Sequence, residues 1–273
     1  MKTLYVSDLD GTLLNSSQTT SKYTESVINS LADKGVLFSY ATARSYSTAR
    51  LAASGISAKI PLVVYNGTFV INNATGERLA SNFFHGNIAN VIRDLLNGSI
   101  NPIVYSIING EEKFSYIESN CNAGQRLFIK SRKGDKRDNP VENETDLLKG
   151  DIFYISCIYD EKHLQPFYNK YKDVFNCLYQ SDIYHDTQWL EIMPHNATKA
   201  NGILTLKKML SCDRIVAFGD GINDIEMLKI ADECYAVSNA VDELKAIATG
   251  IIDSNNNDGV AKWLAENACP VID

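Results

Sequence analysis

The sequence predicts an α/β fold, in which a Rossmann-like, doubly wound parallel sheet forms a core that is interrupted by an inserted α+β domain. Three observations lead to this prediction. Short apolar runs alternate with amphipathic helical segments near the amino end, and the same alternation returns near the carboxyl end. The stretch between them carries hairpin signals instead. We therefore expect a core at residues 1–82 and 189–273 and an inserted domain at residues 83–188.

The first part of the core has the spacing typical of parallel β-α-β units. A helix expected at residues 25–34 has its apolar residues on one face and ends at Gly35, as many helices end at glycine. The expected strands are residues 4–6, 36–41 and 62–65, and a short second helix is expected at residues 47–54.

Turn signals mark the middle of the chain. Asn109-Gly110, between apolar residues 103–108 and 113–117, is a strong hairpin signal, and a further hairpin is expected within residues 68–80. The other elements expected in the insertion are helices at residues 85–96 and 161–174 and strands at residues 152–159 and 176–179.

The last part of the chain resumes the alternation of the core. A strand at residues 189–193 should bring the chain back to the core sheet. The elements expected after it are strands at residues 214–218 and 235–237 and helices at residues 199–209, 223–231, 241–248 and 259–266.

Composition and charge narrow the function classes. The chain has 273 residues, 45% of them hydrophobic and 22% charged, an ordinary globular balance. Its net charge of −7 argues against general nucleic-acid binding. No apolar run is long enough to span a membrane, and the sequence shows no secretory signal pattern, so we expect a cytoplasmic protein. No heptad or broad amphipathic seam predicts an oligomeric state.

A carboxylate pair follows the first expected strand. Residues 8–12 read Asp-Leu-Asp-Gly-Thr, and side chains two positions apart on an extended chain point the same way. Placing Asp8 and Asp10 side by side is costly unless a cation lies between them, and Mg²⁺ prefers such oxygen ligands. An aspartate can also attack phosphorus, while its neighbour transfers protons. The alternative is a solvated turn, which Asp and Gly favour.

Further polar residues follow other expected strands, and the carboxyl ends of parallel strands form the usual ligand site. They are Thr42, Asn66, Asp220 with Asn223 and Asp224, and Lys199 near a helix start. A hydroxyl and an ammonium are suitable donors to a phosphate group. Thr42 and Lys199 also have simpler interpretations, Thr42 as a helix cap and Lys199 as a solvated helix residue. Arg44, two residues after Thr42, could either pair with a carboxylate or contact the substrate.

These motifs together resemble the haloacid dehalogenase superfamily. The resemblance rests on residues 8–12, on residues 41–44 (Ala-Thr-Ala-Arg), on Lys199, and on residues 219–228, which begin Gly-Asp-Gly-Ile-Asn-Asp. Their order and the large insertion are similar to the Cof-type phosphatases with a type-two cap. One departure is Ala43, where the family usually has glycine; a positive φ there would strain alanine.

The resemblance implies a role for each residue. Asp8 would be the nucleophile and Asp10 the general acid/base. Magnesium would be held by Asp8, the main-chain carbonyl of Asp10, and Asp220, with Asp224 orienting water or serving as a ligand. The residues implied in phosphate or substrate binding are Thr42, Arg44, Asn66, Lys199 and Asn223.

The leading hypothesis is a Mg²⁺-dependent phosphatase that hydrolyses small phosphorylated metabolites, with sugar phosphates favoured, through an aspartyl-phosphate. A second hypothesis is a phosphoryl transferase or phosphosugar mutase, in which a hydroxyl replaces water; the core motifs do not separate the two. A third is a phosphometabolite-binding regulator without catalysis, against which the complete motif set argues. The only partner expected is the small phosphorylated substrate.

Overall fold

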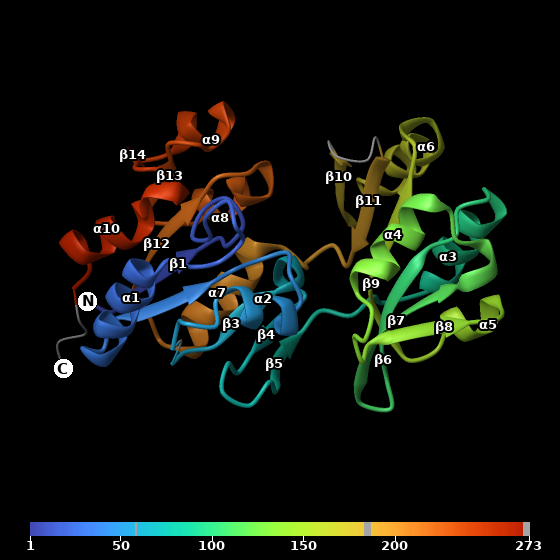
Figure 1. Cartoon of the computed structure of the whole chain (residues 1–273), viewed down its shortest axis with the longest axis horizontal. Helices are drawn as coiled ribbons and strands as arrows, with labels where there is room; N and C mark the ends of the chain where they lie inside the picture. Colours follow the sequence, from blue (N-terminus) through green and yellow to red (C-terminus); the bar gives the residue numbers. More distant parts are fainter. Residues whose placement is uncertain (58, 183–186, 270–273) are drawn as a thin grey trace. The chain divides into compact units, whose positions relative to one another are not determined.

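The computed structural model describes residues 1–57, 59–182 and 187–269. The chain divides into two compact units, drawn in Figure 1. Unit 1 comprises Met1–Ser81 and Ala197–Asp273, and unit 2 comprises Asn82–Asn196. Unit 1 contains a parallel sheet between helices and unit 2 contains a mostly antiparallel sheet, so the predicted fold class is confirmed.

The central sheet of unit 1 is parallel throughout, with the strand order β14-β13-β12-β1-β2. β1 lies between β12 and β2, and Tyr5 pairs with Val216 of β12 on one side and with Phe38 of β2 on the other. The strands are β1 (Thr3–Ser7), β2 (Leu37–Tyr40), β12 (Arg214–Gly219), β13 (Glu233–Val237) and β14 (Gly250–Ile252).

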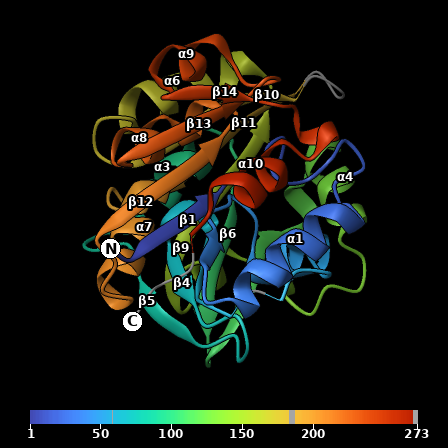
Figure 2. The same cartoon turned by 90° about the vertical axis from the view of Figure 1, so that its left-hand side faces the viewer.

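Helices cover both faces of this sheet, as a doubly wound fold requires. In Figure 2, α1 and α10 lie on one side of the sheet, and α7 and α8 lie on the other. The helices are α1 (Lys22–Asp33), α2 (Tyr46–Ala52), α7 (Lys199–Met209), α8 (Ile225–Lys229), α9 (Asp242–Ile247) and α10 (Gly259–Asn267). Side-chain caps at Ser21 and Thr198 fix where α1 and α7 begin.

The third strand of unit 1 differs from the prediction. β3 (Leu62–Val64) joins the parallel sheet through an isolated parallel bridge, between Ala41 and Val63, rather than as one of its paired strands. Its main partner is β4 (Phe69–Ile71), which pairs in turn with β5 (Arg78–Ser81), and both pairings are antiparallel. The reason is the tight 3₁₀ turn η1 (Tyr65–Gly67), which reverses the chain directly after three residues.

Unit 2 is built on one six-stranded sheet in the order β10-β11-β9-β6-β7-β8. The strands are β6 (Ile103–Ile108), β7 (Glu111–Ile117), β8 (Asp138–Val141), β9 (Asp151–Tyr159), β10 (Asn176–Asp182) and β11 (Thr187–Met193). The helices are α3 (Ile88–Asn97), α4 (Ala123–Ser131), α5 (Glu144–Leu147) and α6 (Glu161–Tyr171). Residues from α3, α6 and one sheet face form its apolar core. Within the described part of the chain, no helix has the length and apolar character of a membrane span.

β11 corrects the domain boundary expected from the sequence. The prediction assigned residues 189–193 to the core sheet, but β11 pairs on both sides within unit 2, with β10 and β9. The break between the units therefore follows Asn196 rather than Gln188. The apolar pattern identified the strand correctly, but a local pattern does not specify which strand is its partner.

Candidate active site

The carboxyl ends of β1 and β12 bring two aspartates to one edge of the sheet. Asp8 directly follows β1, and its backbone N–H donates to the carbonyl of Phe218 at 2.9 Å, which continues the pairing of the two strands. Asp220 directly follows β12. Because parallel strands end at the same edge, residues far apart in sequence meet there, as the sequence predicted.

Lys199 lies between two buried carboxylates. Its Nζ donates to Oδ1 of Asp8 at 2.5 Å and to Oδ1 of Asp224 at 2.7 Å. The three residues are at most 5% exposed. Buried charges are expensive unless they are paired and hydrogen-bonded, so this arrangement needs all three partners.

Burial shifts the protonation of this cluster. It raises the pKa of the Asp8 carboxyl well above its usual range; the Lys199 ammonium opposes the shift, and the carboxylates of Asp224 and Asp220 add to it. Burial also lowers the pKa of Lys199, but attraction to Asp224 and Asp8 outweighs it, so that this pKa lies above its ordinary value. The cluster thus keeps its cation and carries an excess of negative charge.

Asp220 completes the cluster and is held by the first motif. The Thr12 hydroxyl donates to its Oδ1 at 2.7 Å. Burial raises the pKa of Asp220 to about 6, against the effect of the Thr12 hydrogen bond. Gly11, at φ +80°, leaves no room for a side chain, because a Cβ there would lie 2.3 Å from Oδ2 of Asp220.

Asp224 fixes the loop that carries Asp220. Its Oδ2 accepts the backbone N–H groups of Asp220 and Gly221, at 3.0 and 3.1 Å. Its other oxygen accepts from Lys199. One carboxylate therefore links the loop after β12 to the start of α7.

The start of α7 is positioned by two glycines. Gly67, at φ +94°, packs so closely on Thr198 that a Cβ would lie 1.9 Å from the Thr198 carbonyl oxygen. Gly202 packs against Val63, where a Cβ would lie 2.4 Å from Cγ1. The Thr198 side chain caps the helix at the N–H of Asn201. These close contacts fix the position of the first turn of α7, and with it the position of Lys199 in the cluster.

Three carboxylates form a candidate metal site among the described residues. Asp8, Asp220 and Asp224 each offer an oxygen, and these oxygens lie within 4.8 Å of one another. Oxygen donors with excess negative charge fit a hard divalent cation, which would offset the burial and the weaker mutual repulsion that raise the pKa of Asp8 and Asp220. The Asp10 carboxylate lies outside this group.

The side chains of Asp8 and Asp10 have different surroundings, contrary to the expectation that they lie side by side. The Arg44 guanidinium donates two hydrogen bonds to the Asp10 carboxylate, from Nε to Oδ2 at 2.7 Å and from Nη2 to Oδ1 at 2.5 Å. The Asp10 side chain is 47% exposed, whereas that of Asp8 is 7% exposed. Of the two interpretations of Arg44, this geometry favours pairing with a carboxylate.

The remaining predicted residues line the same strand ends. Thr42 is buried, and its Oγ1 accepts the N–H of Arg44 at 3.1 Å; the cap of α2 is Ser45 instead. Asn66 is buried in the left-handed region, at φ 52°, and its N–H donates to the Thr42 carbonyl at 2.9 Å. Ala43 has no positive φ, so its backbone is unstrained by alanine. Asn223 lies in the 3₁₀ turn η3 (Ile222–Asp224), next to Asp224.

Three supporting residues had no assigned role in the sequence analysis. Thr12 orients Asp220, and its place inside the first motif was a usable signal. Gly67 positions α7, and its place directly after Asn66 was a second usable signal. Asn239 donates to the Gly11 carbonyl at 2.8 Å and accepts the N–H of Asn255 at 3.1 Å, and no sequence pattern indicated this.

Comparisons with known proteins cover almost the whole chain. A family model described as haloacid dehalogenase-like hydrolase matches residues 5–264. A 5-amino-6-(5-phospho-D-ribitylamino)uracil phosphatase of Bacillus subtilis is 27% identical over 276 residues, 95% of each chain. A solved structure from Thermotoga maritima aligns with a TM-score of 0.80 at 21% identity, with both chains fully covered. A subclass IIB sugar phosphatase aligns with a TM-score of 0.75 at 16% identity, over 97% of this chain and 98% of that one.

Proposed function

This chain belongs to the haloacid dehalogenase-like hydrolase family and is a phosphomonoesterase, and we propose that it is a Mg²⁺-dependent enzyme that works through an aspartyl-phosphate. The family and the enzyme class expected from the motifs are thereby confirmed. The observation that carries the proposal is the buried ion cluster of Asp8, Lys199 and Asp224 at the strand ends. Strongly shifted carboxyl groups in such a cluster are typical of functional sites.

In the proposed first step, an oxygen of Asp8 attacks phosphorus as the ester bond to the leaving group breaks. Asp10 gives a proton to the leaving oxygen, which departs as an alcohol. In the second step, Asp10 takes a proton from water, and the water oxygen attacks phosphorus and breaks the bond to Asp8. The products are the alcohol, inorganic phosphate and the free Asp8 carboxylate. Arg44 would hold Asp10 in place between the two steps.

A bound Mg²⁺ would be held by Asp8, Asp220 and the main-chain carbonyl of Asp10, with Asp224 as an additional ligand or the residue that orients water. When bound, it would neutralise phosphate charge and the excess negative charge of the cluster. Lys199, Thr42 and Asn223 would donate to the phosphate oxygens, and Arg44 and Asn66 would line the substrate side of the site.

For the substrate we propose the phosphate ester of a sugar or a sugar alcohol. The relative from Bacillus subtilis is named for a substrate that carries a phosphorylated ribityl chain, and the subclass IIB relative is named as a sugar phosphatase. Both names describe a phosphate ester of a polyhydroxylated compound. At 27% and 16% identity they support this class of compound without selecting a member.

The direct test is phosphate release from a panel of such esters, with Mg²⁺ or with a chelator, for the wild type and Asp8→Asn. The panel contains ribitol 5-phosphate, 5-amino-6-(5-phospho-D-ribitylamino)uracil, and hexose and pentose phosphates. We expect release that needs Mg²⁺ and disappears in Asp8→Asn. Release that persists with the chelator or in the variant would contradict the proposal.

The same panel separates the alternatives. A transferase or mutase would consume the ester and yield an isomeric or transferred phosphate ester rather than inorganic phosphate. A regulator would bind an ester with Mg²⁺ and release no product from any member of the panel.

A further inference from the structure

Three asparagines of unit 1 hold the loop that follows Asp10, and the mechanism above gives them no part. The loop is residues 11–16. The asparagines are Asn239, which follows β13, and Asn255 and Asn256, which lie in the 3₁₀ turn η4 (Asn255–Asn257) between β14 and α10. They are 228 to 241 positions away from the loop residues that they contact. We call these three residues the asparagine clamp.

Asn239 joins the loop to the rest of the clamp. Its Nδ2 donates to the Gly11 carbonyl at 2.8 Å, while its Oδ1 accepts the backbone N–H of Asn255 at 3.1 Å. The Nδ2 of Asn255 then donates to the Leu14 carbonyl at 2.9 Å. The first and last carbonyl groups of residues 11–14 are therefore bound by side-chain amides of the clamp.

Asn256 extends the clamp to the end of the loop. Its Oδ1 accepts the N–H of Ser16 at 2.9 Å, and its Nδ2 donates to the Ser16 hydroxyl at 2.8 Å. All these contacts lie within unit 1 and join uncharged groups. The clamp therefore acts on the position of the loop rather than on its charge.

The loop needs such a restraint because of Gly11. Residue 11 has φ +80°, and a Cβ there would lie 2.3 Å from Oδ2 of Asp220, so only glycine fits. Glycine has the widest backbone freedom of any residue, and it does not by itself fix the peptide groups on either side. Asn239 restrains the peptide group that follows Gly11, and Asp10 is the residue that precedes it.

The position of Asp10 depends on the loop more than the position of Asp8 does. The Asp8 side chain is 7% exposed and bonded to Lys199, whereas the Asp10 side chain is 47% exposed, so packing does not fix it. Arg44 binds the Asp10 carboxylate and also donates to Oε1 of Gln18 at 3.3 Å. Because Gln18 lies two residues beyond the loop, this second support of Asp10 is also tied to the loop.

We propose that Asn239 is a positioning residue for proton transfer by Asp10, and that Asn255 supports it. By holding the Gly11 carbonyl, Asn239 sets the backbone from which the Asp10 carboxyl reaches the leaving oxygen of the phosphate ester. In that step a proton passes from Asp10 to the oxygen as its bond to phosphorus breaks. The restraint of the loop stands on the hydrogen bonds alone; its effect on proton transfer rests on the proposed function.

The dependence on the leaving group separates proton donation from general damage. The alcohol of a sugar phosphate must be protonated as it leaves, whereas the dinitrophenolate of 2,4-dinitrophenyl phosphate leaves as a stable anion. For Asn239→Ala we expect kcat/KM to fall about tenfold or more with the best sugar phosphate of the panel, and by less than about twofold with the dinitrophenyl ester. Equal losses with both esters would overturn the proposal, because a distorted site loses both activities alike.

Asn257 offers a matched control in the same turn. Its side chain is exposed and donates to Oδ1 of Asp253 at 3.1 Å rather than to the loop. Asn257→Ala should leave kcat/KM unchanged with both esters. Asn255→Ala, which removes the bond to Leu14, should show the same selectivity as Asn239→Ala at a smaller size. A loss in Asn257→Ala that matches the loss in Asn239→Ala would contradict a specific role of the clamp.

Asp10→Asn is the reference, because it removes the proposed proton donor itself. We expect it to show the largest selective loss with the sugar phosphate. A selective loss in Asp10→Asn together with none in Asn239→Ala would overturn the inference and leave the proposed function intact.

Hydrogen exchange tests the clamp without any turnover. Exchange of the amides of residues 11–16, followed by mass spectrometry of the metal-free protein, should be about tenfold faster in Asn239→Ala than in the wild type, and unchanged in Asn257→Ala. Unchanged exchange in Asn239→Ala would overturn the clamp, whatever the kinetics show. If exchange becomes faster but Asp10→Asn shows no selective loss, the clamp stands and the proton donor of the proposed function fails.

Discussion

The two units bury different kinds of polar group. Among the described residues, the charged residues that are buried, Asp8, Lys199 and Asp224, all belong to unit 1. The buried polar residues of unit 2 are uncharged, and they include Ser106, Ser156 and Gln188. Because a buried ion is costly to keep, its presence in unit 1 marks the place where charge is needed for chemistry. The described interior of unit 2 contains no such ion.

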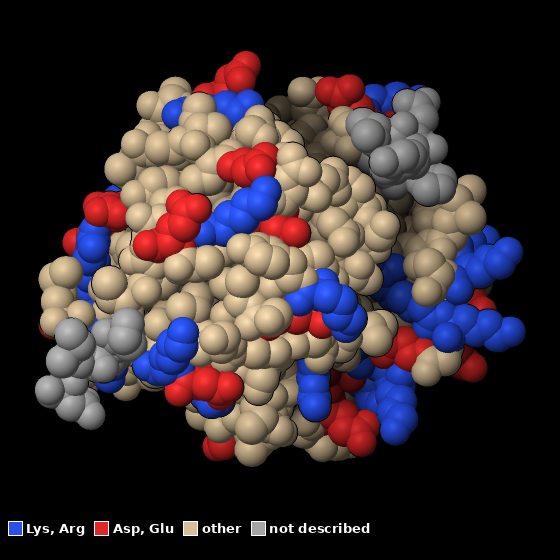
Figure 3. Space-filling view, turned by 60° about the vertical axis from the view of Figure 1, so that its left-hand side comes forward, with Lys and Arg blue, Asp and Glu red and all other residues tan. Residues whose placement is uncertain are grey.

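The charged residues at the surface are distributed differently from the buried ones. Lysine and arginine lie interspersed with aspartate and glutamate on the face drawn in Figure 3. Exposed pairs of this kind, such as Lys262 with Asp253, contribute little to stability because water and salt screen them. The difference between the units therefore concerns their interiors, and four predictions examine it.

The largest effect is expected for Lys199→Met. This change leaves the buried carboxylates of Asp8 and Asp224 without the ammonium that pairs with both, and breaking a buried pair in this way costs about 3–5 kcal/mol. The free energy of unfolding, from urea denaturation of the metal-free protein, measures it. Lys262→Met, which breaks an exposed pair, should leave the midpoint nearly unchanged. Similar midpoints for the two variants would remove the distinction between buried and exposed charge.

The next effect is expected for Gly67→Ala. The substitution combines a left-handed backbone with a clash against the Thr198 carbonyl, so a loss of about 3 kcal/mol and a lower kcat are expected as α7 and Lys199 move. Gly35→Ala is the control, since Gly35 has φ +86° but no atom within 4 Å of a Cβ. It should lose only about 1 kcal/mol, the backbone contribution. Equal losses of unfolding free energy in the two variants would show that the contact between Gly67 and the start of α7 does not contribute to stability.

Metal affinity should depend on pH through Asp220. Its pKa is about 6, so the carboxyl is protonated below that value and must lose its proton to bind a cation. Calorimetric titration with Mg²⁺ should show affinity that falls by at least about tenfold per pH unit below 6, because Asp220 must lose its proton and the raised pKa of Asp8 adds a second competing proton. For the metal-free protein, the effect of pH on stability has the opposite sign to its effect on metal affinity. A carboxyl with a raised pKa stabilises the fold most at low pH, and this contribution is lost as the pH rises through 6. An affinity that is flat between pH 5 and 7 would contradict this assignment.

The smallest changes in the free energy of unfolding are expected for substitutions of two buried serines in strands. Ser39 of unit 1 donates to the Pro61 carbonyl at 2.7 Å, whereas the Ser156 hydroxyl of unit 2 has no partner among the described residues. Ser39→Ala should lower the free energy of unfolding by about 1 kcal/mol, and Ser156→Ala should raise it by about 0.5 kcal/mol. Thermal unfolding of both variants measures the two signs. A loss of stability in Ser156→Ala would show that its hydroxyl is satisfied in solution.

The sequence predicted the parts of this molecule that depend on local pattern. Helix α7 was expected at its observed bounds, Lys199–Met209, and the strand-end rule brought Asp8, Asp220 and Lys199 together. Helix α4 was missed, although Asn122 and Gln125 form a capping box that signals its start.

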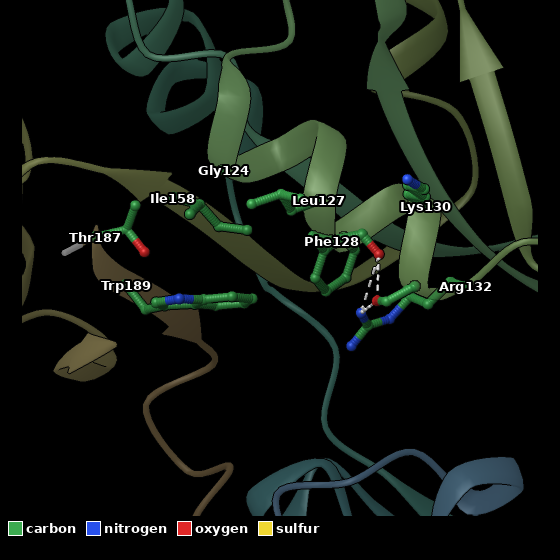
Figure 4. A pocket seen from close by; sticks show the side chains of 9 residues that line it. Gly124, Leu127, Phe128, Lys130, Arg132, Ile158, Thr187 and Trp189 are labelled. Carbon is green, nitrogen blue, oxygen red and sulfur yellow. Dashed lines mark hydrogen bonds between the residues drawn. The ribbon is translucent and has the colours of Figure 1, made fainter. Parts of the chain in front are cut away.

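The rest depends on tertiary partners that a single sequence does not specify. Arg44 and Asp10 are 34 positions apart, and their pairing is decided by side-chain geometry. β11 was recognised as a strand but assigned to the wrong sheet. The rings of Phe128 and Trp189, drawn in Figure 4, meet in unit 2 from an unrecognised helix and a misassigned strand, so no local pattern could reveal their contact.

The central claim is that Asp8 becomes phosphorylated during turnover. The most direct measurement is a single-turnover reaction with Mg²⁺ and the best substrate of the panel, quenched in acid within milliseconds, followed by mass spectrometry of the peptide that contains residue 8. We predict one phosphoryl group on Asp8 that appears and decays at rates compatible with turnover and is absent in Asp8→Asn. Phosphate release at the full rate with no phosphoryl group on Asp8, or with one on another residue, would contradict the account.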